Sequence, residues 1–194
     1  MKKGLTEIIC VIDKSGSMRR LAGDVIGGFD TFIHEQKKLP GEAKLTVTLF
    51  DSTEQILYDG MSIQDVPSLD GQYHPGGMTA LLDAVGKSID CVGTRLAQAP
   101  EEERPENVIM VIMTDGQENS SQEYTREAIQ KAIKRQEEVY SWEFIFLGSN
   151  IDSFNDAMSL GIQQDHYVPY SNTGAGVRRG YASISNSVTK SRTQ

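Results

Sequence analysis

The 194-residue sequence contains few of the side chains that form disulfides or bind metals through sulfur and imidazole: two cysteines and three histidines. A disulfide scaffold needs more cysteines in a shorter chain, so Cys10 and Cys91 are expected to be buried, reduced thiols. His34, His74 and His166 are scattered along the sequence and are expected to be ordinary surface or core side chains rather than ligands. A chain of this length can fold without disulfides or structural metals.

Long apolar runs and excess positive charge are also missing. No apolar run approaches membrane-spanning length, and Glu7 and Asp13 flank the apolar residues 8–12 and so interrupt any secretory apolar region. No small-residue cleavage site follows, so we expect a cytoplasmic protein without membrane contact. The net charge is −8, so non-specific binding to nucleic acid or anionic membrane is not expected of the chain as a whole.

The sequence does contain short apolar runs that alternate with helical stripes. Continuous or alternating apolar residues predict strands at 8–12, 45–49, 55–58, 108–113, 144–147 and 166–168. Apolar residues that recur every three or four positions predict helices at 21–33, 82–96, 128–139, 154–160 and 177–188. This order predicts an α/β fold with a doubly wound, mostly parallel sheet and helices on both faces. The strands at 45–49 and 55–58 are expected to pair as a hairpin across Asp51–Glu54.

The chain shows no internal repeat and no clear linker, so a single domain over residues 1–194 is predicted. Its last segment, residues 171–194, contains four basic side chains and no acidic one, which leaves −12 on the remainder. Two interpretations remain open for this segment. It is a basic helix docked on an acidic body, or a tail that meets another protein or, less readily, nucleic acid.

Three predicted loops carry oxygen-bearing side chains to one edge of the sheet. Ligands of open α/β sheets bind beyond the carboxyl ends of the strands. Asp13, Ser15 and Ser17 follow the first strand, Asp115 follows the strand at 108–113, and Thr79 precedes the helix at 82–96. Oxygen-only ligands select hard cations, Mg²⁺ first, with Mn²⁺ and Ca²⁺ as alternatives.

The elements Asp13-x-Ser15-x-Ser17, Thr79 and Asp115 resemble, in order, the metal-ion-dependent adhesion site of the von Willebrand factor type A family. The resemblance covers roughly residues 5–170. It implies a Rossmann-like sheet with one antiparallel edge strand, here the strand at 55–58. It also implies that Ser15, Ser17 and Thr79 bind the metal directly, that the aspartates often act through water, and that a partner's Asp or Glu completes the octahedron. Intracellular bacterial relatives often resemble accessory subunits of AAA+ ATPases or components of stress-related clusters, so the resemblance implies an AAA+ ATPase as one class of partner.

Simpler interpretations of these residues stay open at this point. Asp13 and Ser15 could cap the helix that follows, Thr79 could cap the next one, and Asp115 could belong only to a turn. Glu118 and Asn119 either line the site or are solvated loop residues.

The functional prediction is a metal-dependent protein-binding module rather than an enzyme. One alternative is a Mg²⁺-dependent phosphohydrolase that uses Asp13 as its nucleophile. The other is a scaffold or accessory subunit whose metal site is vestigial.

Overall fold

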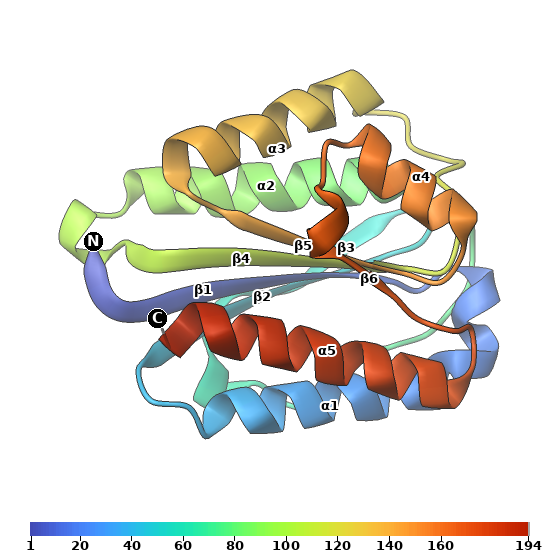
Figure 1. Ribbon diagram of the computed structural model, residues 1–194, viewed down its shortest axis with the longest axis horizontal. Coiled ribbons are helices and arrows are strands. Elements are labelled where there is room, and N and C mark those ends of the chain that lie inside the picture. Colours follow the sequence, from blue (N-terminus) through green and yellow to red (C-terminus); the bar gives the residue numbers. More distant parts are fainter. Residues whose placement is uncertain (194) are drawn as a thin grey trace.

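A six-stranded sheet in the order β3-β2-β1-β4-β5-β6 forms the centre of the protein, in a computed structural model that describes residues 1–193 (Figure 1). Its strands are β1 (Lys2–Asp13), β2 (Glu42–Phe50), β3 (Glu54–Ser62), β4 (Pro105–Thr114), β5 (Glu143–Gly148) and β6 (Tyr167–Pro169). Neighbouring strands are parallel except β2 and β3, which are antiparallel. The predicted mostly parallel sheet with an antiparallel edge strand is therefore confirmed.

Helices cover both faces of this sheet, as predicted. They are α1 (Ala22–Lys37), α2 (Leu81–Gln98), α3 (Arg126–Tyr140), α4 (Ile151–Ser159) and α5 (Gly174–Thr193). Figure 1 shows α1 and α5 on one face and α2, α3 and α4 on the other. A short 3₁₀ helix, η1 (Gly16–Leu21), joins β1 to α1, and three more 3₁₀ turns lie at Ile63–Asp65, Glu101–Glu103 and Gln164–His166.

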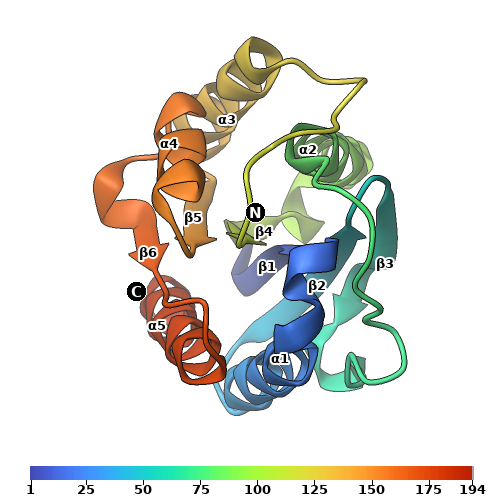
Figure 2. The same ribbon diagram turned by 90° about the vertical axis from the view of Figure 1, so that its right-hand side faces the viewer.

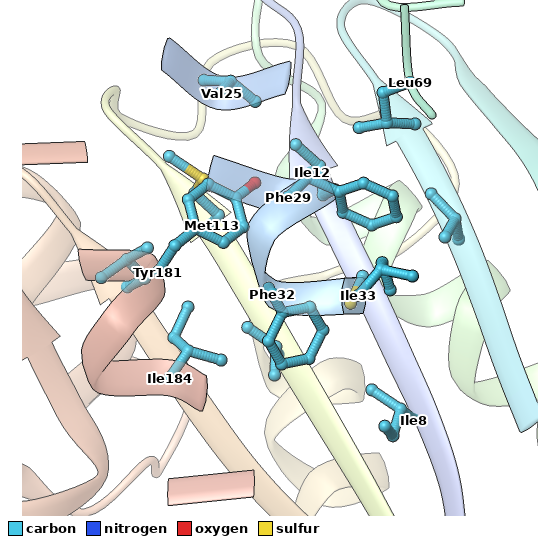
Figure 3. Close-up of a cluster of buried hydrophobic side chains, with 14 of the residues drawn as sticks. Ile8, Ile12, Val25, Phe29, Phe32, Ile33, Leu69, Met113, Tyr181 and Ile184 are labelled. Atoms are coloured by element: carbon cyan, nitrogen blue, oxygen red, sulfur yellow. The ribbon is translucent and has the colours of Figure 1, made fainter. Parts of the chain in front are cut away.

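The central strand β1 shows why its apolar run is unbroken. Ile8 and Ile12 point to the α1 and α5 side, where Figure 3 shows them among Phe29 and other buried side chains. Ile9 and Val11 point to the opposite side and pack with residues of α2. Both faces of β1 are therefore buried, and each such side chain contributes about 1.5–3 kcal/mol to folding.

Several element ends differ from the sequence prediction. The strand predicted at 55–58 extends to Ser62, because two shifts in its register with β2 let pairing continue beyond the alternating segment. The helix predicted to start near Phe154 begins at Ile151, where the Asn150 side chain and Ser153 form a capping box. Both cysteines are free, but only Cys10 is buried, whereas Cys91 is partly exposed on α2.

The C-terminal basic helix α5 packs on the body of the protein, beside α1 (Figure 1). Val177 and Tyr181 are buried, and a Cβ on Gly28 of α1 would collide with the Tyr181 ring. Arg178 forms an ion pair with Asp24 of α1. The docked-helix interpretation is therefore the one the structure supports. Within residues 1–193, no helix combines the length and the apolar composition needed to cross a bilayer.

Candidate metal centre

The predicted ligand residues meet at the carboxyl end of the sheet, which faces the viewer in Figure 2. β1 ends at Asp13 and its parallel neighbour β4 ends at Thr114, so the loops after them start side by side. Asp115 follows β4 directly, and Thr79 lies two residues before α2. Parallel pairing of β1 with β4 thus brings together the Asp13 and Asp115 loops, although Thr114 is 101 residues from Asp13 in the sequence.

Asp13 is fully buried and lies at the base of the site. Its Oδ1 accepts a hydrogen bond from the Ser15 backbone N–H at 2.6 Å, and its Oδ2 accepts one from the Thr114 hydroxyl at 2.6 Å. Burial raises the pKa of Asp13 to about 6; the hydrogen bonds from Thr114 and Ser15 oppose this rise, and the charge of Asp115 adds to it. The carboxyl group is therefore held in place and lies in an environment that disfavours uncompensated negative charge.

Three side-chain oxygens above Asp13 form a continuous chain. Ser15 Oγ lies 3.1 Å from Ser17 Oγ, and the Ser17 hydroxyl donates to Asp115 Oδ1 at 2.6 Å. Magnesium binds oxygen at about 2.0–2.1 Å, so neighbouring ligands of its octahedron lie about 3 Å apart. The spacing of these oxygens fits the edges of such an octahedron.

Backbone contacts place Thr79 beside the same group. The Thr79 N–H donates to Asn119 Oδ1 at 2.9 Å, and the Asn119 N–H donates to the Thr79 carbonyl at 3.0 Å. The Gly16 N–H donates to the Gly77 carbonyl at 3.1 Å, which ties the Thr79 segment to the serine loop. Gly77 has a φ of +70°, and a Cβ there would meet Ser52, so glycine is required at this close approach.

The capping interpretations are wrong for Ser15 and Thr79. Ser15 precedes the 3₁₀ helix η1 but makes no side-chain cap, and Ala80 rather than Thr79 is the residue before α2. The turn interpretation is incomplete for Asp115, since its carboxylate accepts a hydrogen bond from the Ser17 hydroxyl. His74 is exposed and contacts the Gly71 carbonyl, so it belongs to the loop before the site.

Several residues that hold the site were not predicted from the sequence. The Tyr73 hydroxyl donates to the Asp13 carbonyl at 2.6 Å from the long segment between β3 and α2. The Asn150 amide donates to the Asp115 carbonyl at 2.7 Å, and the Asn172 amide lies 3.5 Å from Asp115 Oδ2. Asn150 and Asn172 follow β5 and β6, so the same rule about strand ends would have pointed to them.

Hydroxyl groups and two carboxylates make up the donor set. Among residues 1–193, no three His, Cys, Asp or Glu side chains converge into a metal-binding cluster. A site with Ser15, Ser17 and Thr79 hydroxyls and the Asp13 and Asp115 carboxylates therefore fits a hard, oxygen-seeking cation rather than a thiolate- or imidazole-bound one.

No family model matches the sequence, and no curated protein matches it. Solved structures do match the fold. The vWF domain of the pilus tip protein Mfa5 from Porphyromonas gingivalis is 11% identical, with a TM-score of 0.68 over 97% of this chain and 96% of that one. BatB from Bacteroides thetaiotaomicron is 14% identical, with a TM-score of 0.60 over 97% of this chain and 100% of that one.

A third similar structure is proximal thread matrix protein 1 from the mussel byssus, with a zinc-occupied metal-ion-dependent adhesion site. It is 14% identical, with a TM-score of 0.65 over 95% of this chain. This chain spans only 46% of the length of that mussel protein. At these identities the comparisons establish the fold alone: the chain has the fold of a von Willebrand factor type A domain.

Proposed function

We propose that the chain is a protein-binding module that depends on a divalent metal ion. The observation that carries the proposal is the linked set of oxygens from Ser15, Ser17 and Asp115, with Thr79 beside it. Ser15, Ser17 and Thr79 would hold the ion directly, and Asp13 and Asp115 would act on it through water. The bound ion would supply an electrophilic position for an anionic group, and Mg²⁺ is the first choice because all donors are hard oxygens.

The electrostatics of the site favour an acidic side chain as the partner group. Hydroxyl ligands are neutral and leave most of the ion's charge uncompensated at the surface. Helix α2 starts at Leu81, just beyond Thr79, and the amino end of a helix favours negative charge. An Asp or Glu of a partner protein would therefore complete the coordination.

The rim of the site adds an apolar component to this partner chemistry. Met78 is 53% exposed directly before Thr79, and Ile151 is 67% exposed directly after Asn150, which binds the Asp115 carbonyl. Apolar side chains exposed beside the polar centre would add contact area for a bound protein. The partner segment is thus expected to carry apolar residues beside its acidic one.

The geometry gives no support to the hydrolase alternative. A nucleophilic aspartate must reach its substrate, yet Asp13 is fully buried and both of its oxygens accept hydrogen bonds inside the protein. These contacts suit a side chain that orients a loop and balances charge. We therefore propose a binding role rather than catalysis.

Thermal unfolding with Mg²⁺ and with a chelator tests the metal site. Mg²⁺ at a hundred times its dissociation constant should add about 2.7 kcal/mol of stability, which is about 5–10 °C for a domain of this size. Thr79→Ala should lose most of this rise. The matched control is Thr31→Ala, an exposed threonine on α1 whose hydroxyl contacts only its own helix. Equal melting points with Mg²⁺ and chelator in the unaltered chain would instead support a scaffold with a vestigial site.

Affinity capture tests the partner, with the immobilised chain exposed to cell lysate in Mg²⁺ or in chelator. The proposal expects proteins that are retained only with Mg²⁺ and are lost with Thr79→Ala. Replacing Met78 and Ile151 by serine should weaken their retention while leaving the Mg²⁺-dependent rise in melting temperature unchanged. An AAA+ ATPase among them would bear out that partner prediction, and retention that ignores the metal would contradict the proposed function.

A further inference from the structure

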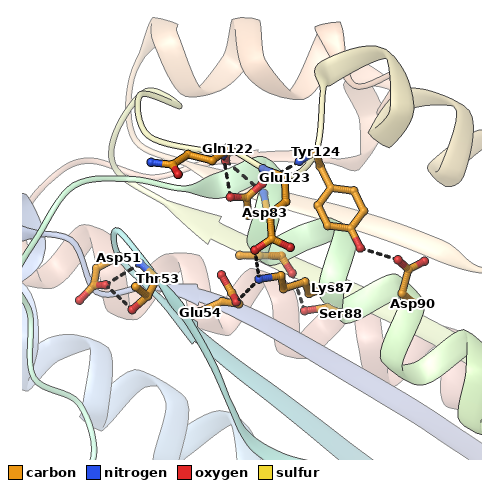
Figure 4. Close-up of polar contacts among 12 residues, drawn as sticks. Asp51, Thr53, Glu54, Asp83, Lys87, Ser88, Asp90, Gln122, Glu123 and Tyr124 are labelled. Carbon is orange, nitrogen blue, oxygen red and sulfur yellow. Dashed lines mark hydrogen bonds and ion pairs between the residues drawn. The ribbon is translucent and has the colours of Figure 1, made fainter.

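An aspartate on helix α2 holds the loop that leads away from Asp115. Asp83 lies in the first turn of α2 and is 6% exposed. Its carboxylate accepts backbone N–H groups from Gln122 at 2.8 Å, Glu123 at 3.0 Å and Tyr124 at 2.9 Å, as Figure 4 shows. These three residues lie near the end of the segment between β4 and α3, about 40 residues farther along the chain.

A glutamate of that same loop holds helix α2 in return. Glu118 Oε2 accepts the Leu82 N–H at 2.9 Å, which is one of the unpaired donors at the amino end of α2. Its Oε1 accepts the N–H groups of Ser120 at 3.0 Å and Ser121 at 2.7 Å. The Ser121 hydroxyl then accepts the Asp83 N–H at 3.1 Å, which closes the circuit.

This reciprocal contact, which we call the Asp83–Glu118 clasp, lies directly beside two predicted ligands. Glu118 is three residues after Asp115, and Leu82 is three residues after Thr79. Between them, Asn119 and Thr79 exchange two hydrogen bonds. The residues from Asp115 to Tyr124 form no helix or strand, so hydrogen bonds to α2 take the place of a regular element there.

We infer that Asp83 and Glu118 are positioning residues that hold Thr79 and Asp115 in a fixed relation before a cation arrives. The inference rests on the proposed function, because it concerns the metal affinity of that same site. Carboxylates bound to backbone N–H groups form strong, charge-assisted hydrogen bonds. A site whose ligands are already in place loses less conformational entropy on binding, and so binds more tightly.

Amide hydrogen exchange in chelator measures the positioning without any metal. Asp83→Ala and Glu118→Gln should each speed exchange at the Thr79 and Asn119 amides by tenfold or more. Asp90→Asn is the matched control, because Asp90 is an exposed carboxylate on the same helix that binds the same loop through the Tyr124 hydroxyl. Its exchange at Thr79 and Asn119 should stay within twofold of the unaltered chain.

Calorimetric titration with Mg²⁺, well below the melting temperature of each variant, measures the consequence for the site. Asp83→Ala should weaken Mg²⁺ binding at least tenfold, and Asp83→Asn less, because its amide oxygen can keep the two bonds that Oδ1 accepts. Asp90→Asn should bind Mg²⁺ as the unaltered chain does.

These results separate positioning from a purely structural role. An Asp83→Ala variant that melts earlier, yet keeps its Mg²⁺ affinity and its slow exchange at Thr79, would overturn the inference. If the unaltered chain bound no Mg²⁺, the proposed function would fail, and the effect on metal affinity would be refuted with it. The exchange experiment would still decide whether the clasp fixes Thr79 against Asp115.

Discussion

Strand β1 carries two fully buried carboxylates, and the protein treats them differently. Glu7 pairs with Arg95 of α2, whose Nη2 lies 2.8 Å from Glu7 Oε1, and it also accepts the Thr46 hydroxyl at 2.8 Å. Asp13, six residues later, accepts a backbone N–H and the Thr114 hydroxyl. No lysine or arginine among residues 1–193 forms an ion pair with Asp13.

The difference separates a structural carboxylate from one prepared for an external cation. A buried charge is tolerated when it is paired. At Glu7 a guanidinium of the protein supplies the pairing, whereas the neighbour of Asp13 is a second carboxylate, Asp115. Even Lys14, the next residue in the chain, directs its ammonium to Asp51 at 2.6 Å. The positive charge that suits the Asp13 end would thus come from a bound ion.

Removing the guanidinium that pairs with Glu7 should produce the largest loss of stability. Arg95→Ala would leave Glu7 buried without its partner and should lower the free energy of unfolding by about 3 kcal/mol, the lower end for a buried pair because Arg95 is partly exposed. Urea unfolding at neutral pH measures it. Lys131→Ala, which breaks an exposed pair with Glu127, should cost less than about 1 kcal/mol. Equal losses in both variants would mean that Arg95 matters no more to Glu7 than an exposed ion pair does, which would contradict the structural role given to Glu7.

Neutralising the other carboxylate should act mainly through the metal. Asp13→Asn keeps a side chain of the same shape and should change stability in chelator by less than about 1 kcal/mol. It should, however, lose most of the stabilisation of about 2.7 kcal/mol that saturating Mg²⁺ gives the unaltered chain. Paired melting curves measure both quantities. A variant that keeps the full response to Mg²⁺ would show that Asp13 plays no part in holding the ion.

Two threonines allow a matched comparison of the hydrogen bonds at each end. Thr114→Val removes the hydroxyl bound to Asp13 and should lower stability in chelator by about 2 kcal/mol, because no cation shares that charge. Thr46→Val removes a hydroxyl that donates to Glu7 and also accepts from Arg95 Nη2 and the Gly60 N–H. It should cost about 1 kcal/mol, since Arg95 still pairs with Glu7. Urea unfolding of both variants decides the order. A larger loss for Thr46→Val would reverse the interpretation.

A third carboxylate, Asp83, is stabilised by backbone N–H groups and should give the smallest effect, visible in acid. Burial pushes its pKa up, but the N–H groups of Gln122, Tyr124 and Glu123 lower it below its ordinary value of 3.8. A carboxyl group whose pKa is lower in the folded than in the unfolded state stabilises the fold at pH values above its unfolded pKa. This contribution is lost as the pH falls through the folded pKa.

Urea unfolding from pH 7 to pH 3 in chelator tests this contribution. The unaltered chain should lose stability below about pH 4 more steeply than Asp83→Asn does. Parallel curves for Asp83→Asn and the unaltered chain would mean that the three N–H groups do not favour the charged form.

Most of the fold followed from the sequence because its signals are local. Residues 8–12 and 108–113 are continuous apolar runs, and such runs are typical of strands buried on both faces. The order of strands and helices then left few topologies open. Element ends were less certain, as for β3, because pairing with β2 extends that strand beyond its own alternating pattern.

The contacts that surround the site were harder to foresee. Tyr73 reaches the Asp13 carbonyl across 60 residues of sequence, and Thr114 reaches its carboxylate across 101. The sequence left open whether Glu118 lines the site or is a solvated loop residue, whereas the structure shows that it caps α2. Nothing in the local pattern distinguishes such a glutamate from an exposed one, since its Oε2 is bound by a helix that lies elsewhere in the chain.

The sequence by itself determined which elements form and which oxygen-bearing side chains lie in the loops at the strand ends, because apolar periodicity and residue type are properties of short segments. Only the tertiary structure decided that Arg95 neutralises Glu7 and that Asp13 instead meets Asp115. Parallel pairing of β1 with β4 brings the two aspartates to the carboxyl end of the sheet. Helix α2 runs across one face of the sheet and carries Arg95 to Glu7, nearer the amino end of β1. The charge balance at each end of β1 therefore depends on how distant segments pack.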